Sequence, residues 1–454
     1  MEPGSSPGYL VDDSGIIFIF SSIAMGPKFP YRYRILIFLF FLILITYLDR
    51  VCISVVGVRI KSEFNLNNEK FGWVLAAFSL AYALCEIPAG ALGDRIGQRR
   101  ILIRIVLWWS LFTALTGLTT GLFTLILVRF LFGMGEAGAF PNSCGVISHW
   151  FPKSETARGL SSVFLGLNVG AAIAPLVVIP IAVAYGWRTT FFINGLIGLL
   201  WVLVCYAWFR NNPSEMKGVS TAEKKYIEEN RRFQTRPTAS AWRSALKNRN
   251  LLTLATAFLC SQWGNYFFLA WMPVYLQEGK HFSEHEMKMT SFYVFITGVF
   301  VVLSVGIVSD WMVKKRGLVF GRRLFGVLAQ GGSAICILLA CLTSNNTLVA
   351  MMLVIGHLFF AANGLVSFSA AVDIGGSNAG TVAGVMNFFG QMGGFLLSVL
   401  FGKLADLANN FTIPIFVLAG VLFTGALLWL FVDPRKQVIL EDGKKQSLVQ
   451  QTMI

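Results

Sequence analysis

The segment GALGDRIGQRR, residues 90–100, is a short basic loop between two long apolar runs. A second segment, GIVSDWMVKKR at residues 306–316, follows another apolar run far along the chain. Each segment begins with a glycine, has an aspartate four residues later and ends in a basic cluster. This repetition indicates that the chain consists of two related halves and that the two loops occupy the same position in each half.

The composition around these loops is that of a membrane protein. Hydrophobic residues make up 55% of the 454 residues and charged residues only 13%, whereas soluble globular chains carry about a quarter charged residues. So few charges cannot cover the surface of a soluble protein of this size, and 40 Phe residues argue against a disordered chain. We therefore expect an all-α membrane protein.

Long apolar runs predict how often the chain crosses the membrane. A helix needs about 20 apolar residues to cross about 30 Å of hydrocarbon, and the chain offers six such runs on either side of one long polar stretch. We predict twelve transmembrane helices in two six-helix halves. The predicted spans are residues 35–57, 71–92, 101–120, 122–147, 159–182, 189–209, 251–276, 289–310, 323–343, 346–372, 379–402 and 411–432.

The polar stretch at residues 210–250 carries ten Lys or Arg residues, and its segment 220–233 starts with helix-capping residues, which predicts a surface helix. The apolar stretch 15–24 is too short to span a membrane, and acidic residues precede it where a signal peptide would be basic. The predicted organisation is an unassigned segment 1–30, a six-helix bundle 31–210, a cytoplasmic linker 211–250, a second six-helix bundle 251–435 and a cytoplasmic tail 436–454.

The positions of the basic residues predict the orientation. Of the 37 Lys and Arg residues, 28 lie in the two end segments or in the loops and adjoining span ends on their side, and seven lie in the opposite loops. Basic residues are retained on the cytoplasmic side of membrane proteins, so both termini are expected to be cytoplasmic. The same rule explains the net charge of +14 without a nucleic-acid partner.

The sequence offers no sign of an enzyme. We find no nucleophile elbow, Walker loop or metal-ligand spacing, and the seven Cys residues lie in apolar runs without a CxxC pair. The segment GMGEAG at residues 133–138 resembles a dinucleotide-binding loop, but it lies inside a predicted span and follows no strand. We expect neither a cofactor nor a metal.

Five charged residues lie well inside predicted spans of the first half: Asp49, Arg50, Glu86, Arg129 and Glu136. A charge at the bilayer centre costs at least about 2.5–3.5 kcal/mol on insertion scales, so such groups usually face a cavity and have a function. Arg129 and Glu136 are seven residues apart and fall on nearly the same helix face, about 10.5 Å apart along the axis. Asp49 and Arg50 diverge by about 100°, so one can face a cavity and the other a neighbouring helix.

The loop at residues 90–100 closely resembles the G-x-x-x-D-R-x-G-x-R-R loop of the major facilitator superfamily, and the loop at 306–316 resembles a degenerate copy of it. Further motifs resemble the anion:cation symporter branch, which includes bacterial galactonate, hexuronate and glucarate transporters and the eukaryotic sialin and vesicular glutamate relatives. These motifs are YLDR at 47–50, YALCEIPAG at 82–90, RFLFGMGEAGAFP at 129–141, WFP at 150–152, GWR at 186–188 and NYFFLAWMPVYL at 265–276.

The resemblance implies a secondary active transporter that takes up an organic carboxylate anion together with protons by alternating access. It implies that Asp49 and Glu136 are the protonatable carboxylates, that Arg50 binds the substrate carboxylate and that Arg129 modulates the two acids. It also implies that the two loops act as a conformational latch, comprising Gly90, Asp94, Arg95, Gly97, Arg99, Arg100, Gly306 and Asp310.

The chemistry of these residue types agrees with that role. A guanidinium binds a carboxylate through two parallel hydrogen bonds, and a carboxylate that loses its Arg partner in an apolar cavity favours its protonated form. Anion and protons would then load together. The alternative is that the charges only form a lattice of ion pairs that holds the helices together.

Glu86 departs from the family pattern, in which a Gln commonly precedes the Ile-Pro pair. An acid here can alter substrate choice, add a third protonatable site or act as a neutral, hydrogen-bonded group in place of Gln. Leu167 also replaces a polar residue that is frequent in sugar-acid transporters, which weakens the case for a hydroxyl-rich substrate. Other candidates for the pocket are Tyr47, Tyr82, Trp263, Asn265, Tyr266, His357, Ser369, Asn387 and Gln391, each of which can instead be a packing residue.

Several functions compete with proton symport. The same fold serves proton-independent exchangers and facilitators of organic anions, and a non-transporting sensor is a rival of another class. A drug exporter is disfavoured because two Arg residues in a cavity select anions. We expect a monomer in contact with membrane lipid, in a bacterial inner membrane, and the sequence does not name the acid.

Overall fold

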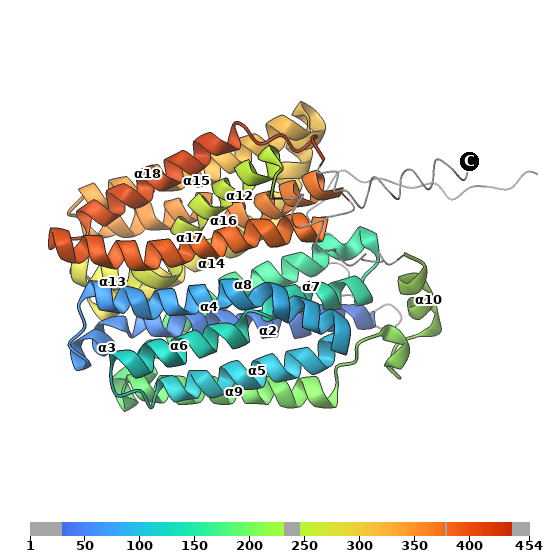
Figure 1. Cartoon of the computed structure of the whole chain (residues 1–454), viewed down its shortest axis with the longest axis horizontal. Helices are drawn as coiled ribbons and strands as arrows, with labels where there is room; N and C mark the ends of the chain where they lie inside the picture. Colours follow the sequence, from blue (N-terminus) through green and yellow to red (C-terminus); the bar gives the residue numbers. More distant parts are fainter. Residues whose placement is uncertain (1–29, 231–245, 377–378, 438–454) are drawn as a thin grey trace, which may run out of the picture.

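The computed structural model describes residues 30–230, 246–376 and 379–437, and every regular element in these ranges is a helix. The predictions for the apolar stretch 15–24, for residues 231–245 of the linker and for the tail beyond residue 437 lie outside these ranges. Figure 1 shows the helices as two groups side by side, α2 to α9 below and α12 to α18 above. We call these groups the N half and the C half.

The N half consists of long helices joined by short turns. Its elements are α2 (Tyr31–Val55), α3 (Gly57–Glu63), α4 (Asn68–Ile96), α5 (Gln98–Thr116), α6 (Leu122–Glu136), α7 (Ala139–Trp150), a 3₁₀ turn (Lys153–Glu155), α8 (Thr156–Tyr185) and α9 (Trp187–Ala207). A second 3₁₀ turn (Pro213–Glu215) and α10 (Thr221–Asn230) follow in the linker. The short helix α3 was not predicted.

The C half repeats this pattern. Its elements are α12 (Arg249–Tyr266), the π-helical segment η3 (Phe267–Trp271), α13 (Met272–Val274), the π-helical segment η4 (Tyr275–Gly279), α14 (Glu284–Arg316), α15 (Leu318–Leu342), α16 (Asn346–Gly375), α17 (Ala379–Ala408) and α18 (Thr412–Trp429). We call the end of the bundle that carries α3 the α3 end, and the opposite end, beside α10, the α10 end (Figure 1).

Ten helices in the described part of the chain are long and apolar enough to cross a membrane, with α6 and α7 counted as one. The other two predicted spans are also helical. One is α5, whose apolar part is shortened by the basic residues of its first two turns, and the other is the interrupted stretch from α12 to η4. The all-helical fold is therefore confirmed, while the count of twelve spans stays a prediction.

Two predicted spans are not continuous α-helices, and a proline lies at each interruption. Pro141 has no N–H to donate to the carbonyl of Ala137, and the helix breaks between α6 and α7 at that point. Pro273 lies between the two π-helical segments, where the chain accommodates the same missing bond by widening its turns. The first break leaves Glu136 as the last residue of α6.

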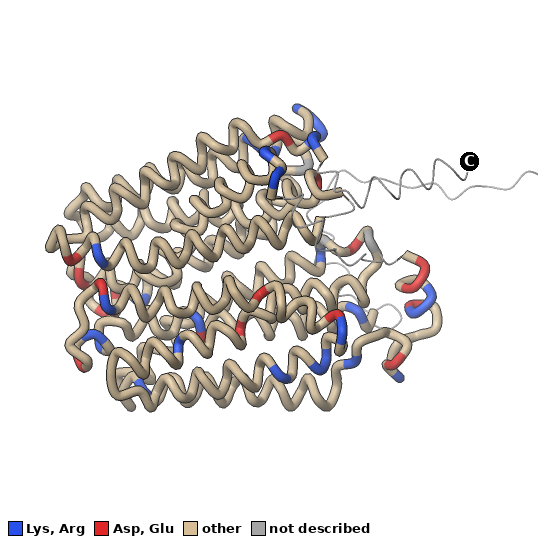
Figure 2. The backbone as a smooth tube through the Cα atoms, in the orientation of Figure 1, with Lys and Arg blue, Asp and Glu red and all other residues tan. Residues whose placement is uncertain are grey.

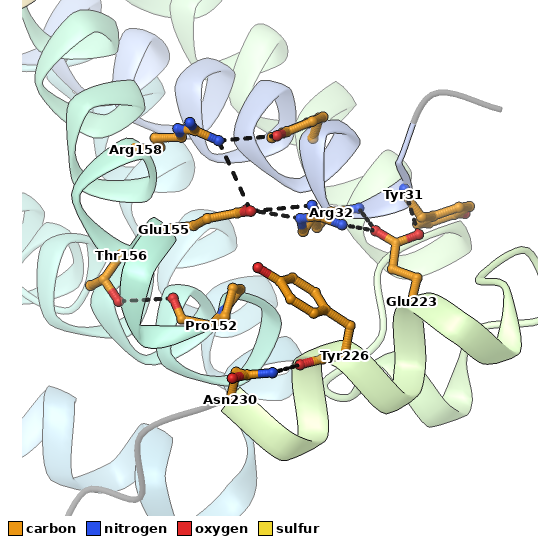
Figure 3. A network of polar contacts seen from close by, with 10 residues as sticks. Tyr31, Arg32, Pro152, Glu155, Thr156, Arg158, Glu223, Tyr226 and Asn230 are labelled. Atoms are coloured by element: carbon orange, nitrogen blue, oxygen red, sulfur yellow. Dashed lines mark hydrogen bonds and ion pairs between the residues drawn. The ribbon is translucent and has the colours of Figure 1, made fainter. Parts of the chain in front are cut away.

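At the α10 end, the linker helix is bound to the start of α2 (Figure 3). Helix α10 covers Thr221–Asn230 of the segment 220–233, for which a surface helix was predicted, and residues 231–233 are outside the described ranges. Glu223 of this helix accepts hydrogen bonds from the backbone N–H groups of Tyr31 (3.0 Å) and Arg32 (3.1 Å). Pro30, at the N-cap of α2, makes no side-chain capping bond, so Glu223 supplies the cap from another element.

The Arg32 side chain strengthens this attachment. Its guanidinium donates to Glu223 (3.1 Å) and, through Nε, to Glu155 (2.8 Å) beside α8 (Figure 3). The linker helix therefore fixes the end of α2, the helix on which Asp49 and Arg50 lie.

Removing this cap should lower the stability of the N half. We expect Glu223→Ala to cost about 0.5–2 kcal/mol, because two N–H groups and a guanidinium lose their acceptor. The measurement is the thermal unfolding midpoint of the purified protein in detergent. Glu229→Ala is the matched control, because Glu229 is exposed on the same helix and pairs with Lys225 only at 3.8 Å; equal midpoints for the two variants would contradict the capping role.

Candidate functional site

The five predicted intramembrane charges, Asp49, Arg50, Glu86, Arg129 and Glu136, are all buried, with at most 9% of each residue exposed. They lie on α2, α4 and α6 of the N half. Figure 2 shows charged positions in the middle of the N half, whereas those of the described part of the C half lie toward its two ends. This distribution makes the interior of the N half the place where charge chemistry is possible.

Arg50 and Glu136 form the central ion pair. Arg50 Nε donates to Glu136 Oε1 at 2.8 Å and Arg50 Nη2 donates to the same oxygen, while Nη1 contacts the Tyr47 hydroxyl at 3.4 Å. The guanidinium carbon also lies 4.7, 4.8 and 5.1 Å from the ring centres of Tyr47, Phe78 and Tyr82. Aromatic faces attract a cation, so three rings and one carboxylate hold Arg50 in place.

Arg129 and Asp49 lie next to this pair and have fewer partners. The Arg129 guanidinium lies 5.2 Å from the centre of the Phe78 ring and 4.5 Å from that of Phe132. Its Nε, both carboxylate oxygens of Asp49 and Oε2 of Glu136 have no hydrogen-bond partner among the described residues. Buried polar groups without partners are costly, and a proton or a bound anion would reduce that cost.

A small cavity separates the two halves at this level. Its lining is Arg50, Ile53, Ser54, Leu75, Phe78 and Arg129 from the N half and Tyr266, Leu269 and Ala270 from the C half. About 10 Å³ is open to the centre of a water molecule, which is room for roughly one water. Arg50 faces this cavity and Asp49 does not, as the 100° offset allows, and the halves must separate before an organic anion can enter.

The C half contributes two amides to the region around the cavity. Tyr266 donates its hydroxyl hydrogen to Gln391 Oε1 at 2.7 Å. Asn387, one helical turn away from Gln391 on α17, donates through Nδ2 to Glu86 Oε1. The Asn387–Glu86 hydrogen bond joins the two halves on the α10 side of the cavity.

Four other pocket candidates are not among the residues that line the cavity. Trp263 is buried and its indole N–H has no hydrogen-bond partner among the described residues, and Asn265 and Ser369 are half-buried. His357 lies among the rings of Phe268, Phe295 and Phe360, at centroid distances of 5.0, 5.1 and 6.5 Å, as expected for a packing residue. Roles for these four in binding stay predictions.

Sequence reasoning did not name Phe78, whose ring lies beside both guanidinium groups. Its signal was present, because Phe78, Tyr82 and Glu86 are spaced four residues apart and so share one face of α4. The sequence also did not name Trp109 and Thr113, whose unpartnered polar atoms lie beside Asp49. That contact joins two helices, so no spacing within one helix reveals it.

The two halves are tied together at the α3 end. Four polar contacts cross between them there: Arg59 to Glu284 (2.9 Å), Lys61 to Glu278 (2.5 Å), and the backbone N–H groups of Asn68 and Glu69 to Asp406 (3.1 and 2.7 Å). Helices α4 and α17 also approach closely, because a Cβ on Gly72 would overlap the carbonyl oxygen of Ser398 and one on Gly402 would overlap that of Asn68.

At the α10 end, the ion pairs that the structure describes stay within one half or involve the linker. Arg32 pairs with Glu155 and Glu223, and Arg322 of α15 pairs with Asp373 of α16. The described contacts between the halves therefore include ion pairs at the α3 end and a neutral amide contact, Asn387–Glu86, on the other side of the cavity.

The predicted latch loops form the turns α4–α5 and α14–α15 at the α10 end. Each turn contains a glycine with positive φ, Gly97 (+89°) in the first and Gly317 (+88°) in the second, so the two loops also repeat the same backbone conformation. Gly317 was not among the predicted latch residues. Asp310 lies on α14, and its side chain is not among those that the structure describes. Three of the other latch residues make contacts within the N half: Gly90 packs on Pro141, the Asp94 carboxylate accepts a hydrogen bond from Gln98 (3.5 Å), and Arg99 donates one to the Tyr206 carbonyl. The remaining three, Arg95, Arg100 and Gly306, are exposed.

Comparison with known proteins decides the family. The model of the Major Facilitator Superfamily matches residues 39–398. The chain belongs to the major facilitator superfamily. As a member of this family it is a multi-pass membrane transporter and not an enzyme.

Several relatives of this superfamily member are named for organic anions, as the motifs of the anion:cation branch indicated. It is 31% identical to a probable sulfoacetate transporter of Cupriavidus necator, over 92% of this chain and 98% of the relative. It is 28% identical to the hexuronate transporter of Bacillus subtilis (88% and 94% covered) and 29% identical to the D-galactonate transporter of an Escherichia coli strain (88% and 95% covered). Among solved structures, a bacterial homologue of the human lysosomal transporter Spinster shares the fold, with TM-score 0.68 and 19% identity over 90% of this chain and 98% of that one.

The close approach of α4 and α17 should depend on the absence of a side chain at residue 402. We expect Gly402→Ala to push the two helices apart and to destabilise the protein by about 1–3 kcal/mol, because the added methyl meets a backbone carbonyl. The measurement is the thermal midpoint in detergent. Gly420→Ala is the control, since a Cβ there meets no atom within 4 Å; a midpoint for Gly402→Ala as high as that of the control would show that the two helices are not in tight contact.

Proposed function

We propose that this transporter moves an organic carboxylate anion together with protons, by alternating access. The observation that carries the proposal is the Arg50–Glu136 ion pair, which presents a guanidinium at the cavity between the halves. The names of the relatives support an organic anion as the substrate class, although they include both singly charged acids and doubly charged ones such as galactarate and D-glucarate.

Coupling follows from competition for one guanidinium. Glu136 makes two hydrogen bonds with Arg50 through a single oxygen, and its other oxygen has no partner in the described structure. A substrate carboxylate that binds the Arg50 fork would displace Glu136 into apolar surroundings, where a carboxyl group favours its protonated form. The anion and a proton would then load in the same step.

Asp49 and Arg129 extend this coupling. Asp49 is buried, and among the described residues the hydroxyl of Thr113 and the indole N–H of Trp109 lie beside its carboxylate. Arg129 lies near both acids, as their electrostatic interactions indicate. We propose that Asp49 carries a second proton and that Arg129 supplies positive charge while Arg50 is occupied by substrate. Tyr47 and Tyr82 would orient the guanidinium, because their rings flank it.

We further propose that the chain crosses the membrane twelve times, as a monomer in a bacterial inner membrane, with the α10 end in the cytoplasm. The α10 end holds the linker, and the positive-inside rule supports this orientation. The ion-paired α3 end then faces away from the cytoplasm, and release of its three side-chain acids from their partners is required for opening on that side.

Uptake by proteoliposomes tests the coupling. With labelled D-galactonate, D-glucuronate or sulfoacetate outside and an inward proton gradient, we expect the wild type to accumulate at least one of them, and Glu136→Gln and Asp49→Asn to lose accumulation while keeping counterflow. Glu229→Gln in the linker is the control and should behave as the wild type. If both carboxylate variants still accumulate substrate, the assignment of coupling is wrong; if the wild type shows counterflow without any response to the gradient, the protein is an exchanger or facilitator.

A further inference from the structure

Glu86 is the one acid among the five intramembrane charges whose hydrogen-bond partner, in the described structure, is a neutral group of the other half. It lies on α4, is 8% exposed and accepts from the Asn387 amide on α17. The acids Asp49 and Glu136 lie close to Arg50 and Arg129. In its ionised form Glu86 adds a negative group to a site where the other charges balance as two acids and two guanidinium groups.

The position of Glu86 relative to Arg50 follows from α4. Phe78 and Tyr82 lie against the Arg50 guanidinium, and Glu86 is the next residue on the same face. Four residues of an α-helix rise about 6 Å, so Glu86 lies about 6 Å beyond Tyr82 toward the α10 end.

The facing helix α17 shows the same two levels. Gln391 contacts Tyr266, which lines the cavity together with Arg50. Asn387 lies four residues earlier, about 6 Å nearer the α10 end, and contacts Glu86. The site thus has a cationic level at Arg50 and, one helical turn away, a second level made of an acid and an amide from opposite halves.

An elongated ligand spans both levels. If its carboxylate binds Arg50, a chain of about four to six atoms brings its far end to Glu86 and Asn387, where it takes the place of their mutual hydrogen bond. A hydroxyl or ammonium group there donates to the Glu86 carboxylate and favours its ionised form, whereas a second carboxylate or a sulfonate meets a like charge when Glu86 is ionised.

We propose that Glu86 is a specificity-determining residue that selects monoanions with a hydrogen-bond donor at the far end and rejects anions with a second negative charge there. The inference rests on the proposed function, since it requires a substrate carboxylate at Arg50. The relatives are named for singly charged acids, such as D-galactonate, and for doubly charged ones, such as D-glucarate, and selection by Glu86 would distinguish these two kinds of anion. A Gln at this position accepts the same donor without repelling an anion, so the departure from the family residue has a direct chemical consequence.

Binding to matched ligand pairs tests the inference. The full chain, purified in detergent, is titrated with gluconate and glucarate and with 6-hydroxyhexanoate and adipate; within each pair the far end is either a hydroxyl or a carboxylate. We expect the wild type to bind the hydroxyl-ended member roughly tenfold or more tightly in each pair. Addition of 6-aminohexanoate tests the ammonium, which should bind at least as tightly as the hydroxyl.

Glu86→Gln should bring the members of each pair to within about threefold of each other and should weaken 6-aminohexanoate. The substitution preserves the shape of the side chain and an oxygen for Asn387, so the variant is expected to fold, and its thermal midpoint checks this. Arg50→Lys is the second variant, and it should weaken every ligand because it loses the two-pronged contact to the carboxylate.

The outcomes separate the two claims. If the wild type binds the dicarboxylates as tightly as the hydroxy acids, or if Glu86→Gln leaves the preference unchanged, the inference about Glu86 is overturned while the anion site at Arg50 stands. If the wild type binds none of the five ligands, or if Arg50→Lys binds them all as the wild type does, the proposed anion site itself is wrong.

Discussion

The burial of a guanidinium in the middle of a membrane bundle is the constraint on which this structure depends. A charge there is costly unless it is paired, and Arg50 is paired with a carboxylate and surrounded by three aromatic rings. The pairing is incomplete, because Glu136 uses only one of its two oxygens for hydrogen bonds with described residues. The unused Glu136 oxygen is open to a proton or to another donor, as a site that exchanges partners requires.

The surrounding fold holds the elements of this site in place. The linker helix caps α2 through Glu223, which fixes the helix that carries Asp49 and Arg50. The helix break at Pro141 leaves Glu136 at the end of α6, and glycines let α4 and α17 meet at the α3 end. The two halves meet through α4 against α17 and α8 against α14, with aromatic contacts such as Phe71–Trp271 and Phe140–Phe368 beside the polar ones. A rocking motion of the two halves would have to exchange these contacts.

Much of this arrangement was predictable from the sequence, for identifiable reasons. Long apolar runs predict membrane-spanning helices, and the repeated loop indicates two halves. Charged residues inside the apolar runs are easy to identify, because 55% of the residues are hydrophobic. The capping residues of the segment 220–233 predicted α10. The offset between Asp49 and Arg50 allowed one of the two to face a cavity and the other a neighbouring helix, and Arg50 is the one in the cavity lining.

Other features depend on contacts between helices and could not be predicted in this way. A hydropathy pattern does not register the missing N–H of Pro141 or Pro273, so the helix break and the π-helical segments were not foreseen. The contacts Glu86–Asn387 and Arg50–Glu136 join residues 301 and 86 positions apart in the chain, and no spacing rule within one helix reports them. Phe78 was recognisable only once the face of α4 that it shares with Tyr82 was known to meet both guanidinium groups.

The central claim is that anion binding at Arg50 releases a carboxylate that then takes up a proton. Isothermal titration of the purified protein with an anion that binds, repeated in buffers of different ionisation enthalpy, counts the protons taken up per anion bound. The account predicts an uptake of about one proton or more in the wild type, and less in Glu136→Gln. Binding without any proton uptake, at a pH where the wild type transports, would contradict it.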